Sequence, residues 1–208
     1  MKSSPVLTSV AEVTAAILTL PGAGREIVGI AGAPGAGKST IAAKVVELLG
    51  PSAALLGMDG WHLPQARLVE LGRRERMGAV DTFDTDGFVR TLDELRTSTG
   101  TVTAPGFDRT IEEAVPNAIS IGPAVHTVVV EGNYLLHDGD GWERVAPLLD
   151  ATFIIRVSPD IRRARLIARH ERFGKTPDDA AAWALGPDEA NARLIDLGAG
   201  RADYTIAL

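Results

Sequence analysis

The sequence contains no cysteine, and this absence excludes several kinds of chemistry. Without cysteine, none of its 208 residues can form a disulfide bond, a thiolate metal site or a cysteine nucleophile. Such a composition suits a reducing compartment, and we expect a cytoplasmic protein. Aromatic residues are also few, at 5%, yet 45% of the residues are hydrophobic. We therefore expect a single domain over residues 1–208 with an ordinary buried core.

Long hydrophobic runs and an excess of positive charge are also lacking. No segment has the uninterrupted apolar length that a membrane span needs, so no membrane partner is expected. The formal net charge of −6 argues against a nucleic-acid-binding surface. Residues 1–24 superficially resemble a signal peptide, but Glu12 interrupts the apolar stretch. We expect a helix packed on the domain here, because apolar residues recur at helical spacing at Val6, Val10, Val13, Ile17 and Leu20.

A glycine-rich segment followed by lysine and serine is the most informative motif. Residues 32–39 match the G-x-x-x-x-G-K-[ST] pattern of a phosphate-binding loop. An apolar run over residues 26–31 precedes it and helical spacing over residues 41–49 follows, as a strand–loop–helix unit requires. Such a loop points backbone N–H groups at one anion, and the helix N-terminus adds partial positive charge. The nucleotide-binding candidates are Gly32, Ala33, Pro34, Gly35, Ala36, Gly37, Lys38, Ser39 and Thr40.

Apolar runs and amphipathic segments alternate along the rest of the chain. We expect strands at residues 53–58, 125–130, 151–157 and 202–206, and helices at 86–95, from Pro159 onward, at 177–185 and at 188–197. This alternation predicts an α/β fold, a three-layer α/β/α sandwich with a mainly parallel sheet. Ligands of such sheets bind beyond the carboxyl ends of the strands, so the residues there are the functional candidates.

Acidic residues follow two of the expected strands. Asp59 comes after the strand at 53–58, where a carboxylate can take the proton of an attacking hydroxyl group. Glu131 follows a run of valines and can hold Mg²⁺, for which the Ser39 hydroxyl is a second ligand. Turn formation is the alternative explanation for both carboxylates. His62 and Tyr134, which lie shortly after them, are candidates for substrate contact.

Basic residues are concentrated in the helix that Ser158 and Pro159 begin. Arg165 and Arg169 lie one turn apart on a shared face, where guanidinium groups can stabilise the phosphoryl group that is transferred from ATP. With Gly174 as a hinge, residues from about 160 to 177 are expected to form an arginine-rich lid over the phosphates. The alternative is a solvated charged helix face, which is the commonest role of such runs.

Two expected loops combine carboxylates with an aromatic ring. Their residues are Asp81, Phe83 and Asp84 in one, and Phe107, Asp108 and Arg109 in the other. Aromatic stacking and carboxylate oxygens suit a polyhydroxylated acceptor such as a sugar or a nucleoside. Helix capping by Asp84 or Asp86, with loop packing by Phe83, explains the same residues equally well.

Seven stretches, taken in order from about residue 26 onward, match the motifs of one group of enzymes. They are GAPGAGKST at 32–40, MDGWH at 58–62, GAVDTFDTDGF at 78–88, PGFDR at 105–109, VVVEGNYLL at 128–136, RLIARHERFGKT at 165–176 and DEANA at 188–192. In this set the chain resembles the uridine kinase, pantothenate kinase and phosphoribulokinase branch of the P-loop kinases. It most resembles the nucleoside/nucleotide kinase family proteins that are often labelled fructose-transport-system kinases.

The resemblance implies roles for matching positions in an ATP- and Mg²⁺-dependent kinase. Asp59 would be the general base and Glu131 the Mg²⁺-linked acid, while Lys38 and Ser39 would be nucleotide ligands. The lid arginines would include Arg165 and Arg169, and Asp84 falls where the uridine kinases hold ribose hydroxyls. Two departures concern the acceptor. Asp81 stands where glutamate is expected, and the tyrosine–histidine pair that reads a pyrimidine is not recognisable at residues 107–109.

We therefore expect a kinase that transfers the γ-phosphoryl group of ATP to a hydroxyl of a small metabolite, such as a sugar, a nucleoside or a pantothenate-like alcohol. A uridine or cytidine kinase is the nearest alternative. An acceptor-independent P-loop ATPase and a non-catalytic nucleotide-binding module are the others. The oligomeric state stays open, with a homodimer as one candidate.

Overall fold

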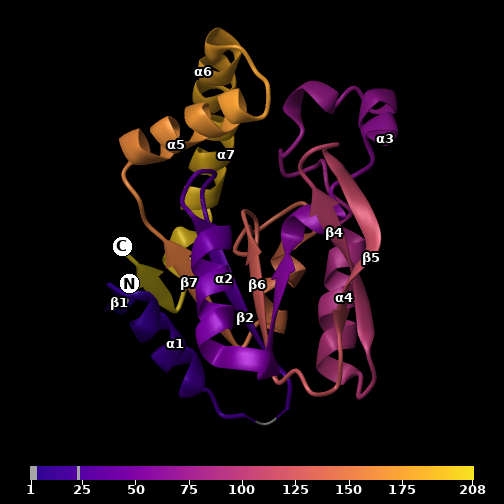
Figure 1. The fold of residues 1–208 in the computed structure, drawn as a ribbon, viewed down its shortest axis with the longest axis vertical. Helices are drawn as coiled ribbons and strands as arrows, with labels where there is room; N and C mark the ends of the chain where they lie inside the picture. The colour runs from indigo at the N-terminus through magenta and orange to yellow at the C-terminus, as the bar shows by residue number, and fades with distance from the viewer. Residues whose placement is uncertain (1–3, 23) are drawn as a thin grey trace.

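A parallel sheet of six strands forms the centre of the molecule (Figure 1), whose computed structural model describes residues 4–22 and 24–208. The strand order is β1 (Val6–Leu7), β8 (Tyr204–Ile206), β7 (Ala151–Ile155), β2 (Glu26–Gly32), β6 (Thr127–Gly132) and β3 (Ala53–Gly57). Every neighbouring pair in this sheet runs parallel. The predicted α/β class with its mainly parallel sheet is confirmed.

Helices cover both faces of the sheet, so its central strands are apolar on both sides. Val128 and Val130 of β6 belong to one hydrophobic cluster, whereas Val129 between them belongs to the other. The first cluster is closed by α4 (Thr85–Thr97) and α7 (Pro187–Gly198), and the second by α1 (Val10–Leu18) and α2 (Lys38–Leu49). This arrangement is the expected three-layer sandwich (Figure 1).

The N-terminal segment is a short strand followed by a helix, which corrects the expected single helix over residues 1–24. Val6, counted above among the helical positions, pairs with Thr205 at the edge of the sheet. The helix starts only at Val10 because the Ser9 side chain caps it, accepting a hydrogen bond from the Glu12 backbone N–H at 3.1 Å. Residues 1–3 and 23 of that expectation lie outside the described residues.

Residues 102–121 form an antiparallel hairpin that the periodicity did not predict. Its strands are β4 (Val102–Asp108) and β5 (Glu113–Ile121), and their register shifts between Ala104 and Gly106. The segment 105–109, expected to be a loop, is therefore strand as far as Asp108. The irregularity accommodates Pro105, which has no N–H for the ladder. The hairpin lies beside α4 and reaches up to α3 (Gln65–Glu70; Figure 1).

Three C-terminal helices rise above the carboxyl edge of the sheet (Figure 1). They are α5 (Pro159–Arg172), α6 (Pro177–Leu185) and the upper part of α7. The arginine-rich helix begins as the sequence predicts, with Ser158 as its cap and Pro159 in its first turn. Among the described residues, no helix combines the length and the apolar character needed to cross a membrane.

Core packing by α4 should carry a large part of the stability of this fold. Leu92 is fully buried between the sheet and the helix. We expect Leu92→Ala to lower the free energy of unfolding by about 2–5 kcal/mol, because it leaves a cavity that the core cannot close. The control Leu48→Ala, at a position that is 59% exposed, should change it by about 0.5 kcal/mol or less. Urea denaturation measures both, and equal effects would contradict this assignment of the core.

Candidate active site

The phosphate-binding loop joins β2 to α2 at the carboxyl edge of the sheet. Gly35 and Gly37 have φ angles of 77° and 93°, which a residue with a side chain rarely adopts. A cavity of about 370 Å³ lies over this loop, and its wall includes Pro34, Gly35, Gly37, Lys38, Ser39 and Thr40. The other three candidates lie behind that surface, since Gly32 ends β2 while Ala33 and Ala36 are buried.

Two carboxylates from neighbouring strands reach the same cavity. Glu131 is the penultimate residue of β6, is only 8% exposed, and accepts a hydrogen bond from the Ser39 hydroxyl at 2.9 Å. Asp59 lies in a short helical turn, Met58–Trp61, that follows β3. The strand pairing explains their proximity, because Gly57 of β3 lies opposite Glu131 of β6. Two acidic candidates that are far apart in sequence are thus brought to one edge.

The surroundings of Glu131 and Asp59 shift the pKa values of the two carboxylates in opposite directions. Burial raises the pKa of Glu131, the negative charge of Asp59 adds to that effect, and Lys38 only partly opposes it. Burial also acts to raise the pKa of Asp59, but His62, Arg109 and Lys38 outweigh it, so its pKa lies below the ordinary value. Asp59 is therefore ionised at neutral pH and can accept a hydrogen bond from a hydroxyl group.

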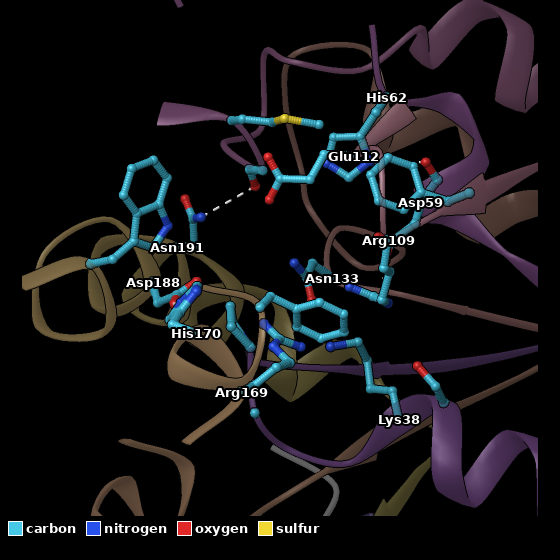
Figure 2. A pocket seen from close by; sticks show the side chains of 18 of the residues that line it. Lys38, Asp59, His62, Arg109, Glu112, Asn133, Arg169, His170, Asp188 and Asn191 are labelled. Atoms are coloured by element: carbon cyan, nitrogen blue, oxygen red, sulfur yellow. Dashed lines mark hydrogen bonds and ion pairs between the residues drawn. The ribbon is translucent and has the colours of Figure 1, made fainter. Parts of the chain in front are cut away.

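A basic and aromatic wall surrounds Asp59. Arg109, from the end of the β4–β5 hairpin, donates a hydrogen bond to its carboxylate at 2.6 Å. The ring of His62 lies 4.1 Å from that of Phe83 and 4.8 Å from that of Phe107, between centroids. His62 also bonds the Asp59 carbonyl through Nδ1 at 2.9 Å, and burial lowers the pKa of its imidazole. Figure 2 shows Asp59, His62 and Arg109 on one side of the cavity.

Helix α5 supplies arginines from the opposite side. The guanidinium group of Arg165 approaches the phosphate loop, since a methyl group added at Gly37 would lie 3.6 Å from its Nη1. Arg169 also lines the cavity, and burial lowers the pKa of its guanidinium group. Arg162 has a structural role instead: it is 5% exposed, donates to the Pro34 carbonyl at 3.1 Å, and bonds Glu189 of α7 at 3.0 Å. The base of the expected lid is thus docked on the phosphate loop.

Several cavity residues were not singled out as site candidates by the sequence. They are Arg74, Met77, Gly78, Glu112, Asn133, His170, Phe173, Lys175, Trp183, Asp188 and Asn191. His170 and Asp188 form a pair on the helical side, 2.8 Å apart between Nε2 and Oδ2 (Figure 2). The Lys175 ammonium lies 4.3 Å from the centre of the Trp183 ring. Seven of them fall within the stretches at 78–88, 128–136, 165–176 and 188–192 that resemble a kinase family, whereas Arg74, Met77, Glu112 and Trp183 fall within none of these stretches.

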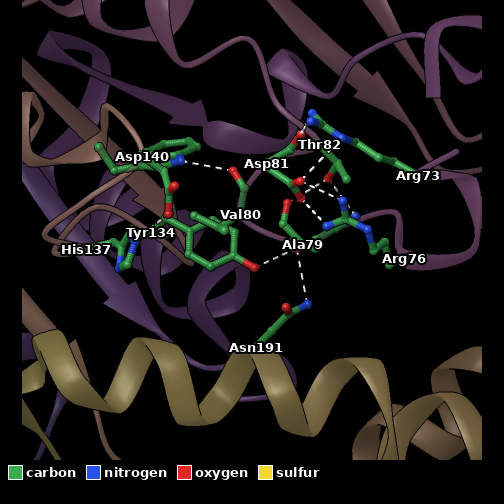
Figure 3. A network of polar contacts seen from close by, with 12 residues as sticks. Arg73, Arg76, Ala79, Val80, Asp81, Thr82, Tyr134, His137, Asp140 and Asn191 are labelled. Atoms are coloured by element: carbon green, nitrogen blue, oxygen red, sulfur yellow. Dashed lines mark hydrogen bonds and ion pairs between the residues drawn. The ribbon is translucent and has the colours of Figure 1, made fainter. Parts of the chain in front are cut away.

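The loop over residues 77–83 is held in place by contacts to its backbone (Figure 3). The Gly78 carbonyl accepts hydrogen bonds from the Tyr134 hydroxyl at 2.7 Å and from the Asn191 amide at 3.2 Å. Asp81 is bound by Arg73 and Arg76. The expected role of Asp81 in a substrate loop is therefore replaced by an ion-pair network that fixes the cavity wall.

Three other substrate candidates, Asp84, Asp108 and Tyr134, have structural roles instead. None of the three is among the described residues that line the cavity. Asp84 caps α4 by accepting from the Gly87 N–H at 2.9 Å, as the capping alternative predicted. Asp108 caps the hairpin turn through the Thr110 N–H at 2.8 Å. Tyr134 is fully buried among aromatic rings, with its hydroxyl on Gly78. The sequence shows how many residues separate each of these positions from the end of a strand, but it does not show which way their side chains point.

Comparison with known proteins gives a consistent set of relatives. The model of the phosphoribulokinase / uridine kinase family matches residues 27–179. The ATP-dependent kinase-like protein notR' of Aspergillus versicolor is 39% identical over 60% of this chain and 77% of its own length. The Escherichia coli K12 protein YggC is 30% identical over 93% of this chain and 82% of its own. A crystal structure from Silicibacter sp. TM1040, provisionally named fructose transport system kinase, has a TM-score of 0.87 at 35% identity, covering 96% of this chain and 99% of that one.

Ionisation of Glu131 should destabilise the ligand-free protein. Because folding raises its pKa above the ordinary 4.5, the folded state holds the proton more tightly, and stability falls as pH rises through and above that value. Glu131→Gln removes this cost and keeps an oxygen for Ser39. Its free energy of unfolding, relative to the wild type, should therefore increase from about pH 4 to about pH 8. Urea denaturation across this range tests the sign, and a flat or falling difference would contradict it.

Proposed function

This chain belongs to the phosphoribulokinase / uridine kinase family of ATP-dependent P-loop kinases, and on that premise we propose that it transfers the γ-phosphoryl group of ATP to a hydroxyl group of a small metabolite. One observation carries the proposal. The Asp59 carboxylate and the phosphate-binding loop with Lys38 line the same cavity, from different strand ends (Figure 2). A nucleotide-binding module without an acceptor has no need of a carboxylate in that place.

Asp59 is the proposed general base. Its lowered pKa keeps it ionised, so it can accept a hydrogen bond from the acceptor hydroxyl and hold the oxygen in line with the terminal phosphorus. As the new O–P bond forms and the bond to ADP breaks, the hydroxyl proton passes to the carboxylate. Arg109 positions Asp59 through the 2.6 Å ion pair.

Cationic groups on the facing side stabilise the charge of the transferring group. Lys38, Arg165 and Arg169 line the cavity, and the N-terminus of α2 presents unpaired backbone amides to an anion. Charge that develops on the equatorial phosphoryl oxygens is stabilised by such preorganised donors more strongly than by water. Burial lowers the pKa of Lys38 while Glu131 and Asp59 oppose that effect, so neutralising these carboxylates should weaken its charge.

The residues around Ser39 fit a magnesium ion bound together with ATP. The Ser39 hydroxyl and the Glu131 carboxylate are hard oxygen donors and adjoin each other at 2.9 Å. Within the part of the chain that the structure describes, no group of three or more histidine, cysteine or carboxylate side chains could hold a metal. Magnesium that shares its ligands with phosphates needs only one or two protein oxygens. When bound, it would neutralise phosphate charge, and Ser39 and Glu131 would hold it.

Replacing Asp59 tests the proposed base. We expect Asp59→Asn to lower kcat by about 10²- to 10⁴-fold, because the amide cannot take the proton. The Kd of ATP should stay within about twofold, since the phosphate loop is untouched. Steady-state ADP release and calorimetric titration with ATP measure the two quantities. Normal turnover in this variant would refute the assigned role.

Asp84→Asn is the matched control for that variant. It changes a carboxylate that caps α4 outside the cavity, and asparagine caps helices as well as aspartate does. Turnover should therefore remain at the wild-type level. A large loss of activity in Asp84→Asn would show that the cap position contacts the acceptor after all.

A screen of acceptors tests the reaction class itself. ADP release is measured with ATP and Mg²⁺ against sugars, alditols, nucleosides and pantothenate-like alcohols, one at a time. We expect at least one acceptor to raise ADP release about tenfold or more above the acceptor-free rate, because water is a poorly positioned substitute for a bound hydroxyl. Acceptor-independent release would indicate an ATPase. Preference for uridine or cytidine would indicate the nucleoside kinase alternative.

A further inference from the structure

The cavity contains recognition groups that the transfer step does not use, and we propose that they select a polyhydroxylated acceptor, a sugar or an alditol with at least three hydroxyl groups. The inference rests on the proposed kinase function and specifies its acceptor. It assigns recognition of the non-reacting hydroxyls to two ion pairs, His170–Asp188 and Arg74–Glu112. The third such pair in the cavity, Arg109–Asp59, takes the reacting hydroxyl.

Four carboxylates line the cavity, and the three other than Glu131 are each bound by one basic side chain. Arg109 holds Asp59 at 2.6 Å, Arg74 holds Glu112 at 3.0 Å, and His170 holds Asp188 at 2.8 Å. Asp59 and Glu112 lie on the side of the cavity that carries His62, and Asp188 lies across from them on the helical side (Figure 2). A bound molecule that fills the cavity would meet them at several points along its length.

Each pair uses only one oxygen of its carboxylate. The bases contact Oδ2 of Asp59, Oε2 of Glu112 and Oδ2 of Asp188. Among residues 4–22 and 24–208, no protein hydrogen bond reaches the second oxygen of any of the three. The cavity therefore offers three carboxylate oxygens with acceptor capacity, each next to a positively charged or N–H-bearing group.

A hydroxyl group is the ligand group that satisfies such a pair completely. It donates its proton to the carboxylate oxygen, and its lone pairs accept from the neighbouring guanidinium or imidazole N–H. A carboxylate ligand would be repelled by the acid, and an ammonium ligand by the base. The aromatic rings of His62, Phe83 and Phe107 add an apolar surface between the polar points. Adjacent hydroxyls on a carbon chain or ring combine both features.

Asp188 is the clearest case of a cavity residue that is not needed to hold the helices together. Glu189, its neighbour on α7, already joins α7 to α5 through Arg162 and Arg163 at 3.0 Å each. Asp188 is 7% exposed, yet it belongs to the cavity wall, which Glu189 does not. Among the described residues no buried side-chain oxygen lacks a partner, so the second oxygen of Asp188 is open to the cavity, where a ligand or water can donate to it. Recognition of a hydroxyl accounts for its position.

Glu112 provides independent support from the opposite side. It lies in the hairpin turn with a φ angle of 51°, a backbone conformation that non-glycine residues seldom adopt. The turn is held there by Gln65, whose side-chain amide donates to the carbonyls of Ile111 and Glu112. Strained residues that the surroundings hold in place are concentrated at ligand sites. The hairpin thus places the Glu112 carboxylate at the rim of the cavity.

The test measures KM and kcat of the full chain with a panel of pentoses, hexoses and alditols, with uridine, cytidine, pantothenate and simple monohydroxy alcohols for comparison. We expect the best acceptor to be a sugar or alditol. For that acceptor, Asp188→Asn and Glu112→Gln should each raise KM by about 10- to 100-fold, as loss of a hydrogen bond to a charged group does. In Glu112→Gln, the KM of ATP should change by about twofold or less.

Analogues of the best acceptor that lack one hydroxyl locate the contacts. Some deoxy analogues should have a KM about tenfold or more higher than the full acceptor with the wild-type protein. If the missing hydroxyl is the one that Asp188 or Glu112 binds, replacing that carboxylate should raise the KM of the analogue little further, because two losses of the same contact are not additive. Asp196→Asn is the control on the same helix, since Asp196 is 63% exposed at its side chain. It should leave every parameter unchanged. Thermal unfolding shows whether Asp188→Asn still folds, and the exposed Glu112→Gln provides the same test if it does not.

The outcomes separate this inference from the proposed function. If an acceptor with a single hydroxyl, or a nucleoside, is preferred, the inference is overturned while the kinase assignment stands. Unchanged acceptor KM in both variants also overturns it. If no acceptor of any class stimulates ADP release, the proposed function fails and the inference fails with it.

Discussion

The parallel pairing of β2 with β6, and of β6 with β3, is the constraint on which the site depends. Ala31 lies opposite Gly132 and Gly57 opposite Glu131, so the segments that follow these strands leave the sheet at the same edge. Parallel strands need crossover connections, and the carboxyl ends of all of them therefore meet on one side. The phosphate loop, the proposed magnesium ligand Glu131 and the proposed base Asp59 become neighbours although they are far apart in the chain.

The electrostatics of the cavity then divide the work between two similar side chains. Glu131 is deeply buried next to Ser39, and burial raises its pKa, so a cation nearby would favour its ionised form. Asp59 is surrounded by basic side chains that lower its pKa, so it is ionised at neutral pH without a metal ion. Carboxylates whose environments move their pKa values in opposite directions commonly take different roles. Metal binding by the first and proton transfer by the second are the assignments that this difference favours.

The helical wall gives the site its shape and depends on one buried arginine. Arg162 bonds both the phosphate loop and Glu189 of α7, and an added side chain at Gly35 would collide with the Arg162 carbonyl at 2.7 Å. The close contact of α5 with the loop orients Arg165 and Arg169 toward the cavity and places His170 opposite the hairpin. Removing one partner of such a buried pair is costly, because the other charge is left without compensation.

Local patterns in the sequence were sufficient for the strand–loop–helix unit, the Ser158–Pro159 helix start and the carboxylates at the carboxyl ends of β3 and β6, because each rests on interactions between residues close in the chain. The hairpin β4–β5 was not predictable in this way, since β5 is mostly solvent-exposed and the pairing of the two strands follows from the register around Pro105. Side-chain direction was equally beyond the sequence: Asp84, Asp108 and Tyr134 follow structural contacts, whereas Asp188 and Glu112 reach the cavity. The sequence by itself determined the fold class and the nucleotide loop. Only the tertiary structure decided which polar groups surround the acceptor, because that depends on packing between elements that have no contact along the chain.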